Sequence, residues 1–147
     1  MPDVLHFRKL EALFAAAPIN QALIKEAKIR VKEGFAELSL PIRQEYYHGA
    51  MSLHGAIYFK LLDDAAYFAA ASMETQYFMV TKRYQIDFRR PVTGGVLKAS
   101  GELVSAGESD WLAKSEIVNE NGQLVASGQG VFVKSRLKLN DQKGYSS

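Results

Sequence analysis

Two features of one apolar stretch could do chemistry together. A His-Gly pair, His54 and Gly55, opens a run rich in Ala and Leu, and two adjacent carboxylates, Asp63 and Asp64, follow within the same run. If the run is a helix, its first backbone N–H groups are unpaired and can donate to an oxygen that becomes negative. A carboxylate can attack a carbonyl carbon or activate a water. We therefore expect one of the two carboxylates to be functional.

The stretch from residue 54 to residue 72 predicts one long helix, about 55–72. At about 100° per residue, apolar side chains cover more than half of its circumference, which is typical of a buried helix. Asp63 and Asp64 lie at opposite edges of the narrow polar strip that remains. The rest of the chain is therefore expected to pack around this helix.

Two elements are predicted ahead of this helix. Residues 3–17 have apolar side chains at helical spacing, with Asp3 as a candidate cap, and Pro18 ends this first helix. Residues 28–32 and 35–42 alternate around a Glu-Gly turn, which indicates a hairpin. The first helix could then pack across a sheet.

Strands are predicted after the central helix. Residues 76–90 form a long alternating segment, with Phe78 and Val80 on one face and Met79 and Thr81 on the other. Three further strands are expected at 96–106, 111–119 and 123–134. Because strands and helices do not alternate along the chain, the fold class is α+β, with an antiparallel sheet curled around one buried helix.

The composition fits one globular domain. The chain has 147 residues, 48% of them hydrophobic, and we expect a single domain over 1–134 and a polar, disordered tail over 135–147. The net charge of +2 is too small for a nucleic-acid-binding footprint, and the lack of cysteine excludes disulfides and thiolate chemistry. With no apolar run of about 18 residues and no signal-peptide pattern, we expect a cytoplasmic protein that does not enter a membrane.

Several short motifs lie at characteristic spacing along residues 28–134. They are His48-Gly49-Ala50-Met51-Ser52-Leu53-His54-Gly55-Ala56, then Asp63, Phe88-Arg89-Arg90-Pro91, and the later Gly94-Gly95, Gly107, Gly122 and Gly130. In this pattern the chain resembles the hotdog-fold acyl-CoA thioesterases of the PaaI-like branch. It departs from the family at three positions, because His48 stands where the family often has Asn, Met51 replaces a Gly, and Ala56 replaces the third residue of His-Gly-Gly.

The resemblance implies a hotdog fold, in which a curled antiparallel sheet wraps around one long central helix, here with an extra N-terminal helix. It also implies hydrolysis of an acyl-CoA to free acid and CoA, with no cofactor because CoA is part of the substrate. Asp63 would be the general base or nucleophile, and the Gly55 backbone N–H the oxyanion donor. An enoyl-CoA hydratase-type enzyme and a non-catalytic acyl-CoA-binding hotdog domain are the alternatives.

Three further residues are candidates for the site, each with a structural alternative. His54 would orient the substrate or cap the helix. His48 would replace the family's Asn in holding water or substrate, or would be a solvated loop residue. Thr81 lies where relatives commonly carry a Ser or Thr that positions water, or it is an ordinary strand residue. For Asp64, and less so for Asp63, the alternative is an ion pair with a cation such as Lys60.

The basic residues Arg89 and Arg90 are candidate contacts for the CoA phosphates. The histidines lack carboxylates at helical spacing, so no metal site is expected.

The expected assembly is a homo-oligomer, a dimer or a dimer of dimers, because the long strand would otherwise leave an exposed edge. Gly55 and Asp63 lie about 12 Å apart along one helix axis, at about 1.5 Å per residue. Both groups must come within about 3 Å of reacting atoms, or one water beyond. We therefore expect each site to combine Gly55 of one subunit with Asp63, and Thr81, of its partner.

Overall fold

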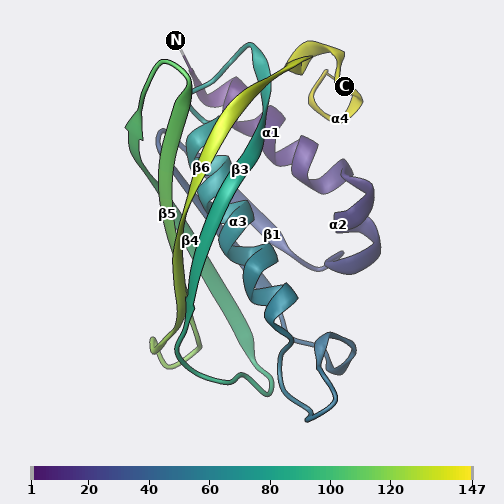
Figure 1. Cartoon of the computed structure of the whole chain (residues 1–147). Helices are drawn as coiled ribbons and strands as arrows, with labels where there is room; N and C mark the ends of the chain where they lie inside the picture. Colours follow the sequence, from purple (N-terminus) through teal and green to yellow (C-terminus); the bar gives the residue numbers. More distant parts are fainter. Residues whose placement is uncertain (1, 147) are drawn as a thin grey trace.

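One long helix lies inside the curve of a single sheet (Figure 1). The computed structural model describes residues 2–146. Its elements are α1 Val4–Ala16, α2 Pro18–Leu23, β1 Lys28–Lys32, β2 Phe35–Pro41, α3 Gly55–Ala71, β3 Tyr77–Phe88, β4 Val96–Ala106, β5 Asp110–Val118, β6 Leu124–Lys138 and α4 Lys143–Ser146, with short 3₁₀ turns at Gln44–Tyr46 and Leu139–Asp141. The strands pair antiparallel in the order β1-β2-β4-β5-β6-β3. This confirms the expected α+β class and the extra N-terminal helix.

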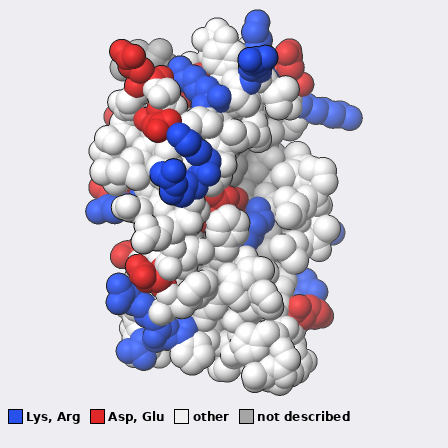
Figure 2. Space-filling model, in the orientation of Figure 1, with Lys and Arg blue, Asp and Glu red and all other residues white. Residues whose placement is uncertain are grey.

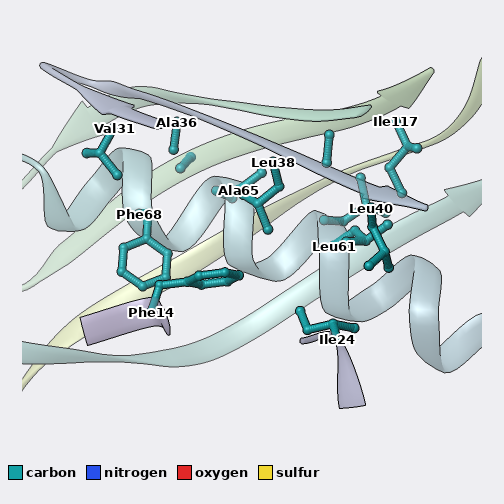
Figure 3. Packing of buried hydrophobic residues seen from close by; sticks show 14 of the residues in the cluster. Phe14, Ile24, Val31, Ala36, Leu38, Leu40, Leu61, Ala65, Phe68 and Ile117 are labelled. Carbon is teal, nitrogen blue, oxygen red and sulfur yellow. The ribbon is translucent and has the colours of Figure 1, made fainter. Parts of the chain in front are cut away.

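Helix α3 is buried because small side chains let the sheet approach its backbone. Gly101 of β4 lies so close to the helix that a Cβ at this position would overlap the carbonyl group of Ala65. Around this contact, Ala65 lies beside Leu38 and Leu61 beside Leu40, and both leucine partners belong to β2 (Figure 3). The apolar arc predicted from the sequence is therefore the face that the sheet covers.

Helices α1 and α2 cover the side of α3 that the sheet leaves open (Figure 1). Phe14 of α1 meets Phe68 of α3 edge-to-face, with the ring centroids 5.6 Å apart (Figure 3). Asn20 of α2 is buried and donates from its side-chain nitrogen to the Phe14 carbonyl oxygen at 2.8 Å. The α1–α2 corner is thus fixed against the central helix.

The C-terminal segment differs from the prediction of a disordered tail from residue 135. Strand β6 continues to Lys138, and Leu139 and Tyr145 are buried. The Tyr145 hydroxyl donates to His6 Nδ1 at 2.8 Å, and His6 Nε2 donates to the Ala71 carbonyl oxygen at 2.9 Å. These buried contacts join the segment to α1 and α3, although its composition is polar. Residue 147 lies outside the described residues.

The side chains of strand β3 do not alternate without interruption, although the sequence predicted that they would. The β3–β6 register shifts between Thr81 and Arg83, which marks a β-bulge at this point. Before the bulge Met79 is buried and Val80 is exposed, so the face predicted for Met79 and Thr81 is the one turned to the helix. The bulge thereby places Thr81 and Tyr84 on the same, helix-facing side of the strand.

Candidate active site

The N-terminus of α3 begins at a histidine cap. His54 Nδ1 accepts a hydrogen bond from the Ala56 N–H at 2.9 Å, so this amide is no longer available to a ligand. Within residues 2–146 the Gly55 N–H makes no hydrogen bond. The Gly55 N–H, the oxyanion donor expected from the sequence, therefore stays available to a ligand, whereas the neighbouring Ala56 N–H does not.

His48 stabilises the loop before α3. Its Nδ1 accepts from the Ala50 N–H at 3.0 Å, and its Nε2 lies 3.0 Å from Ser52 Oγ. Because Nδ1 is an acceptor, the proton of the neutral ring is on Nε2, which donates to Ser52. In the same loop Met51 has a φ of 67°, in the left-handed region that favours glycine. The residue that departs from the family's Gly therefore keeps the backbone conformation that suits glycine.

A shallow hollow of about 390 Å³ surrounds the start of α3. We call it the N-terminal hollow, and it is lined by His48, Ser52, Leu53, Gly55, Tyr58, Phe88, Arg89, Arg90 and Pro91. The Tyr58 hydroxyl donates to the Arg90 carbonyl oxygen at 2.8 Å, which fixes the strand end against the helix. The candidate oxyanion donor and the two candidate phosphate-binding arginines thus share one hollow.

Asp63 lies near the middle of α3 and faces strand β3. Thr81 Oγ1 donates to Asp63 Oδ1 at 2.9 Å. Partial burial raises the pKa of the Asp63 carboxyl group, while the Thr81 hydrogen bond and the positive charge of Lys60 oppose the rise. Two sequence candidates, Asp63 and Thr81, are therefore brought into direct contact.

The adjacent carboxylate, Asp64, is buried in an ion pair. Lys60 Nζ lies 2.6 Å from Asp64 Oδ2, one helical turn away. Burial raises the pKa of Asp64 to about 6, although Lys60 acts in the opposite direction. Lys60, which the sequence offered as an ion-pair partner for either carboxylate, thus pairs with Asp64.

A larger cavity of about 870 Å³ opens beside the middle of α3. We call it the helix-side cavity, and its lining includes Phe14, Ala17, Asn20, Lys60, Asp63, Asp64, Tyr67, Phe78, Thr81 and Gly144. In the space-filling view the surface is hollowed between the sheet side and the α1–α2 side, with acidic and basic atoms inside the hollow (Figure 2). The walls are mostly apolar, and the charged groups are Lys60, Asp63 and Asp64 of α3 and Lys143 of α4.

The sequence candidates therefore fall into two groups within one chain. His48, Gly55, Arg89 and Arg90 line the N-terminal hollow, whereas Asp63 and Thr81 line the helix-side cavity. His54 caps the N-terminus of α3, next to Gly55. One chain does not bring the oxyanion donor and the carboxylate to the same hollow.

Sequence reasoning missed two groups that support Asp63. Tyr84 and Ser115 hydrogen-bond to each other, and both hydroxyls lie within hydrogen-bonding distance of the carbonyl oxygen of Leu62, the residue before Asp63. Gly128 and Gly130 of β6 make room for the Tyr84 ring, because a Cβ at either position would overlap it. The Lys60–Asp64 pair was not missed: it is the ion pair named from the sequence as the structural alternative for Asp64, at the four-residue spacing of neighbours on a helix.

The described residues, 2–146, hold no group of three His, Asp or Glu side chains placed to bind a metal ion. Over the same range no helix has the length and apolarity needed to cross a membrane.

Residues 51–126, more than half of the chain, match the family model of the thioesterase superfamily. The acyl-coenzyme A thioesterase PaaI of Escherichia coli K12 is 32% identical over 103 residues, covering 69% of this chain and 72% of that protein. A structure of the E. coli PaaI protein from the phenylacetic acid degradation operon gives a TM-score of 0.83 at 25% identity, covering 94% of this chain and 99% of that one.

A mutant of the phenylacetic acid degradation protein PaaI from Thermus thermophilus shares the fold. Its TM-score is 0.72 at 23% identity, with 81% of this chain and 100% of that chain covered. Together with the curled sheet around α3, these similarities confirm the hotdog fold and the enzyme class expected from the sequence. The chain belongs to the thioesterase superfamily and is a PaaI-like thioesterase with the hotdog fold.

Proposed function

We propose that this thioesterase hydrolyses an acyl-CoA to the free acid and CoA, without a cofactor. The observation that carries the proposal is the Asp63 carboxylate, which lines the helix-side cavity with Oδ1 held by Thr81 at 2.9 Å. The similarity to an acyl-coenzyme A thioesterase supports the substrate class. We also propose that the protein is located in the cytoplasm, as expected from the sequence.

Asp63 acts as the general base or the nucleophile in this proposal. Its partial burial makes the carboxylate more basic than it would be in water. With Oδ1 held by Thr81, Oδ2 is left to meet a water or the thioester carbon. As a base, Asp63 takes a proton from the water whose oxygen bonds to the carbonyl carbon. The C–S bond then breaks and the leaving sulfur takes that proton from Asp63, so CoA leaves as the thiol and Asp63 is again ionised.

The Gly55 N–H donates to the carbonyl oxygen as that oxygen becomes negative. The positive end of the α3 dipole favours the same charge. His54 supports this role indirectly, because its cap on Ala56 fixes the first turn of the helix. Arg89 and Arg90, which line the same hollow as Gly55, are placed to meet the phosphates of CoA.

Each site is completed by a second copy of the chain. Gly55 and Asp63 are separated by about 12 Å along α3 and line different hollows. Strand β3, which carries Thr81, is an edge strand, so one side of it is free to pair with another chain. We therefore propose a homodimer, alone or within a tetramer, in which Gly55 of one subunit faces Asp63 and Thr81 of its partner.

Free-thiol release from a panel of short, long and aryl acyl-CoA substrates tests the proposal. The wild-type protein is expected to release thiol from at least one of them. Asp63→Asn should lower kcat by about 10²–10⁴ with little change in substrate binding. An unchanged kcat in Asp63→Asn, or no thiol release by the wild type from any class, would contradict the proposal.

A further inference from the structure

Three charged side chains lie within little more than one turn of α3 and line the helix-side cavity. Lys60 precedes Asp63 by three residues and Asp64 by four, and both spacings place side chains on neighbouring positions of a helix surface. Lys60 Nζ is 2.6 Å from Asp64 Oδ2, and their side chains are only 16% and 11% exposed. One shielded cation therefore stands within reach of two carboxylates.

This ion pair is not explained by the packing of the domain. A buried ion pair loses about as much in desolvation as it gains from attraction, so an apolar pair would serve a core equally well. Lys60 also lies over the Phe14 ring, 6.0 Å from its centroid, at the wall of the cavity. The pair is placed where it can act on Asp63.

Among the groups that line the cavity around Asp63, Lys60 is the one placed to act on its ionisation. On α3, the Tyr67 hydroxyl donates to the Met79 carbonyl oxygen at 2.6 Å, and burial raises its pKa. On β3, Thr81 does not titrate, and burial raises the pKa of Tyr84 to about 12. From the C-terminal segment, Lys143 is exposed and solvated. The part of the α1–α2 corner that lines the cavity, residues 13–20, carries no titratable side chain.

We propose that Lys60 and Asp64 are positioning residues that set the protonation of Asp63, with the single charge of Lys60 divided between the two carboxylates. This inference rests on the proposed function, in which Asp63 must be ionised to act. Because Asp64 draws Lys60 toward itself, the two halves of the pair act on Asp63 in opposite directions.

Removing each half of the pair makes distinct predictions. In Lys60→Met the partly buried Asp63 carboxylate loses the positive charge of Lys60, so its proton is held more tightly and the acidic limb of activity moves to higher pH. In Asp64→Asn a negative neighbour disappears and Lys60 is released toward Asp63, so the limb moves to lower pH. We expect each shift to be about one pH unit.

The test is the pH profile of kcat/KM for thiol release, which reports the ionisation of the free enzyme. It compares the wild type with Lys60→Met, Asp64→Asn, the double variant and Lys60→Arg. Lys60→Arg keeps the charge and should leave the limb within about 0.3 pH unit of the wild type, since its cation stays beside both carboxylates. The double variant should lie between the two single variants.

Opposite shifts in the two single variants support the proposal. A merely structural pair would reduce the plateau of kcat/KM and the melting temperature in both variants without separating the limbs. Equal shifts, or shifts in one common direction, overturn the proposal, and Asp64→Asn alone decides it if Lys60→Met does not fold. Asp63→Asn is measured alongside. If Asp63→Asn is inactive while the acidic limbs of Lys60→Met and Asp64→Asn match the wild type, this inference fails and the proposed function stands. If Asp63→Asn is active, the proposed function itself fails.

Discussion

Thr81 of β3 donates a hydrogen bond to Asp63 of α3 across the interface between the edge strand and the central helix, with 2.9 Å between Oγ1 and Oδ1. The β-bulge after Thr81 turns both Thr81 and Tyr84 toward the helix, which an unbroken alternation of β3 could not do. The strand irregularity is therefore part of the site.

Thr81→Val should lower kcat by about tenfold, because the nearly isosteric side chain keeps the packing but leaves Asp63 Oδ1 without its donor. The hydrogen bond lowers the pKa of Asp63, so its loss should also move the acidic limb of activity to higher pH. Thr81→Ser keeps the hydroxyl and should stay within about threefold of the wild type. Equal losses in the Val and Ser variants would contradict the role given to the hydrogen bond.

The buried Asp64 predicts a pH dependence of stability. Its pKa of about 6 in the folded state lies above the value of about 3.9 for an unfolded chain, so the folded state binds this proton more tightly. The contribution of this group to the free energy of unfolding should therefore increase as the pH falls from 7 through 6 toward 4.

Urea unfolding of wild type and Asp64→Asn at pH 7 and pH 5 isolates this contribution from the other carboxylates. The free energy of unfolding should change by about 1 kcal/mol more in the wild type than in Asp64→Asn between these pH values. Parallel changes in the two proteins would mean that Asp64 titrates normally.

Met51→Gly should stabilise the protein by about 0.5–1 kcal/mol. Met51 holds a φ of 67°, which costs an L-residue roughly 1–2 kcal/mol, and the larger backbone entropy that glycine loses on folding offsets part of this. The Met51 side chain is exposed, so little packing is lost. Met51→Ala, which keeps the Cβ, should give no such gain. Chemical denaturation measures both, and a loss of stability in Met51→Gly would show that the Met side chain holds the loop.

Periodicity was sufficient for the bounds of the two longest helices, α1 and α3, and for the α+β class. The resemblance to the thioesterase family, and not periodicity, named Asp63 and Thr81 as candidates. Periodicity failed where tertiary contacts override local pattern. The bulge after Thr81 interrupts the predicted alternation of β3, and no residue type in β3 signals it. The C-terminal segment is ordered through the contact of Tyr145 with the buried His6, a pairing across the whole chain that local composition cannot reveal.

The central claim is that each site joins Gly55 of one subunit to Asp63 of the other. Gly55→Pro removes the N–H but suits the first position of a helix, and His54 already has the extended conformation that proline requires of its predecessor, with φ −70° and ψ 142°. Gly55→Ala is the matched control, because it keeps the N–H and its Cβ would make an ordinary contact, 3.5 Å from the Phe88 ring. The Ala variant should stay active where the Pro variant does not.

The most direct measurement mixes Gly55→Pro chains with Asp63→Ala chains. Each homodimer should be nearly inactive, while each heterodimer regains one site that combines the intact Gly55 of one chain with the intact Asp63 of the other. After equal amounts are unfolded together and reassociate at random, half of the dimers are mixed and half of their sites work, so about a quarter of wild-type activity should return. If mass spectrometry finds the heterodimers and no activity returns, the two residues do not form a shared site, and the account is contradicted.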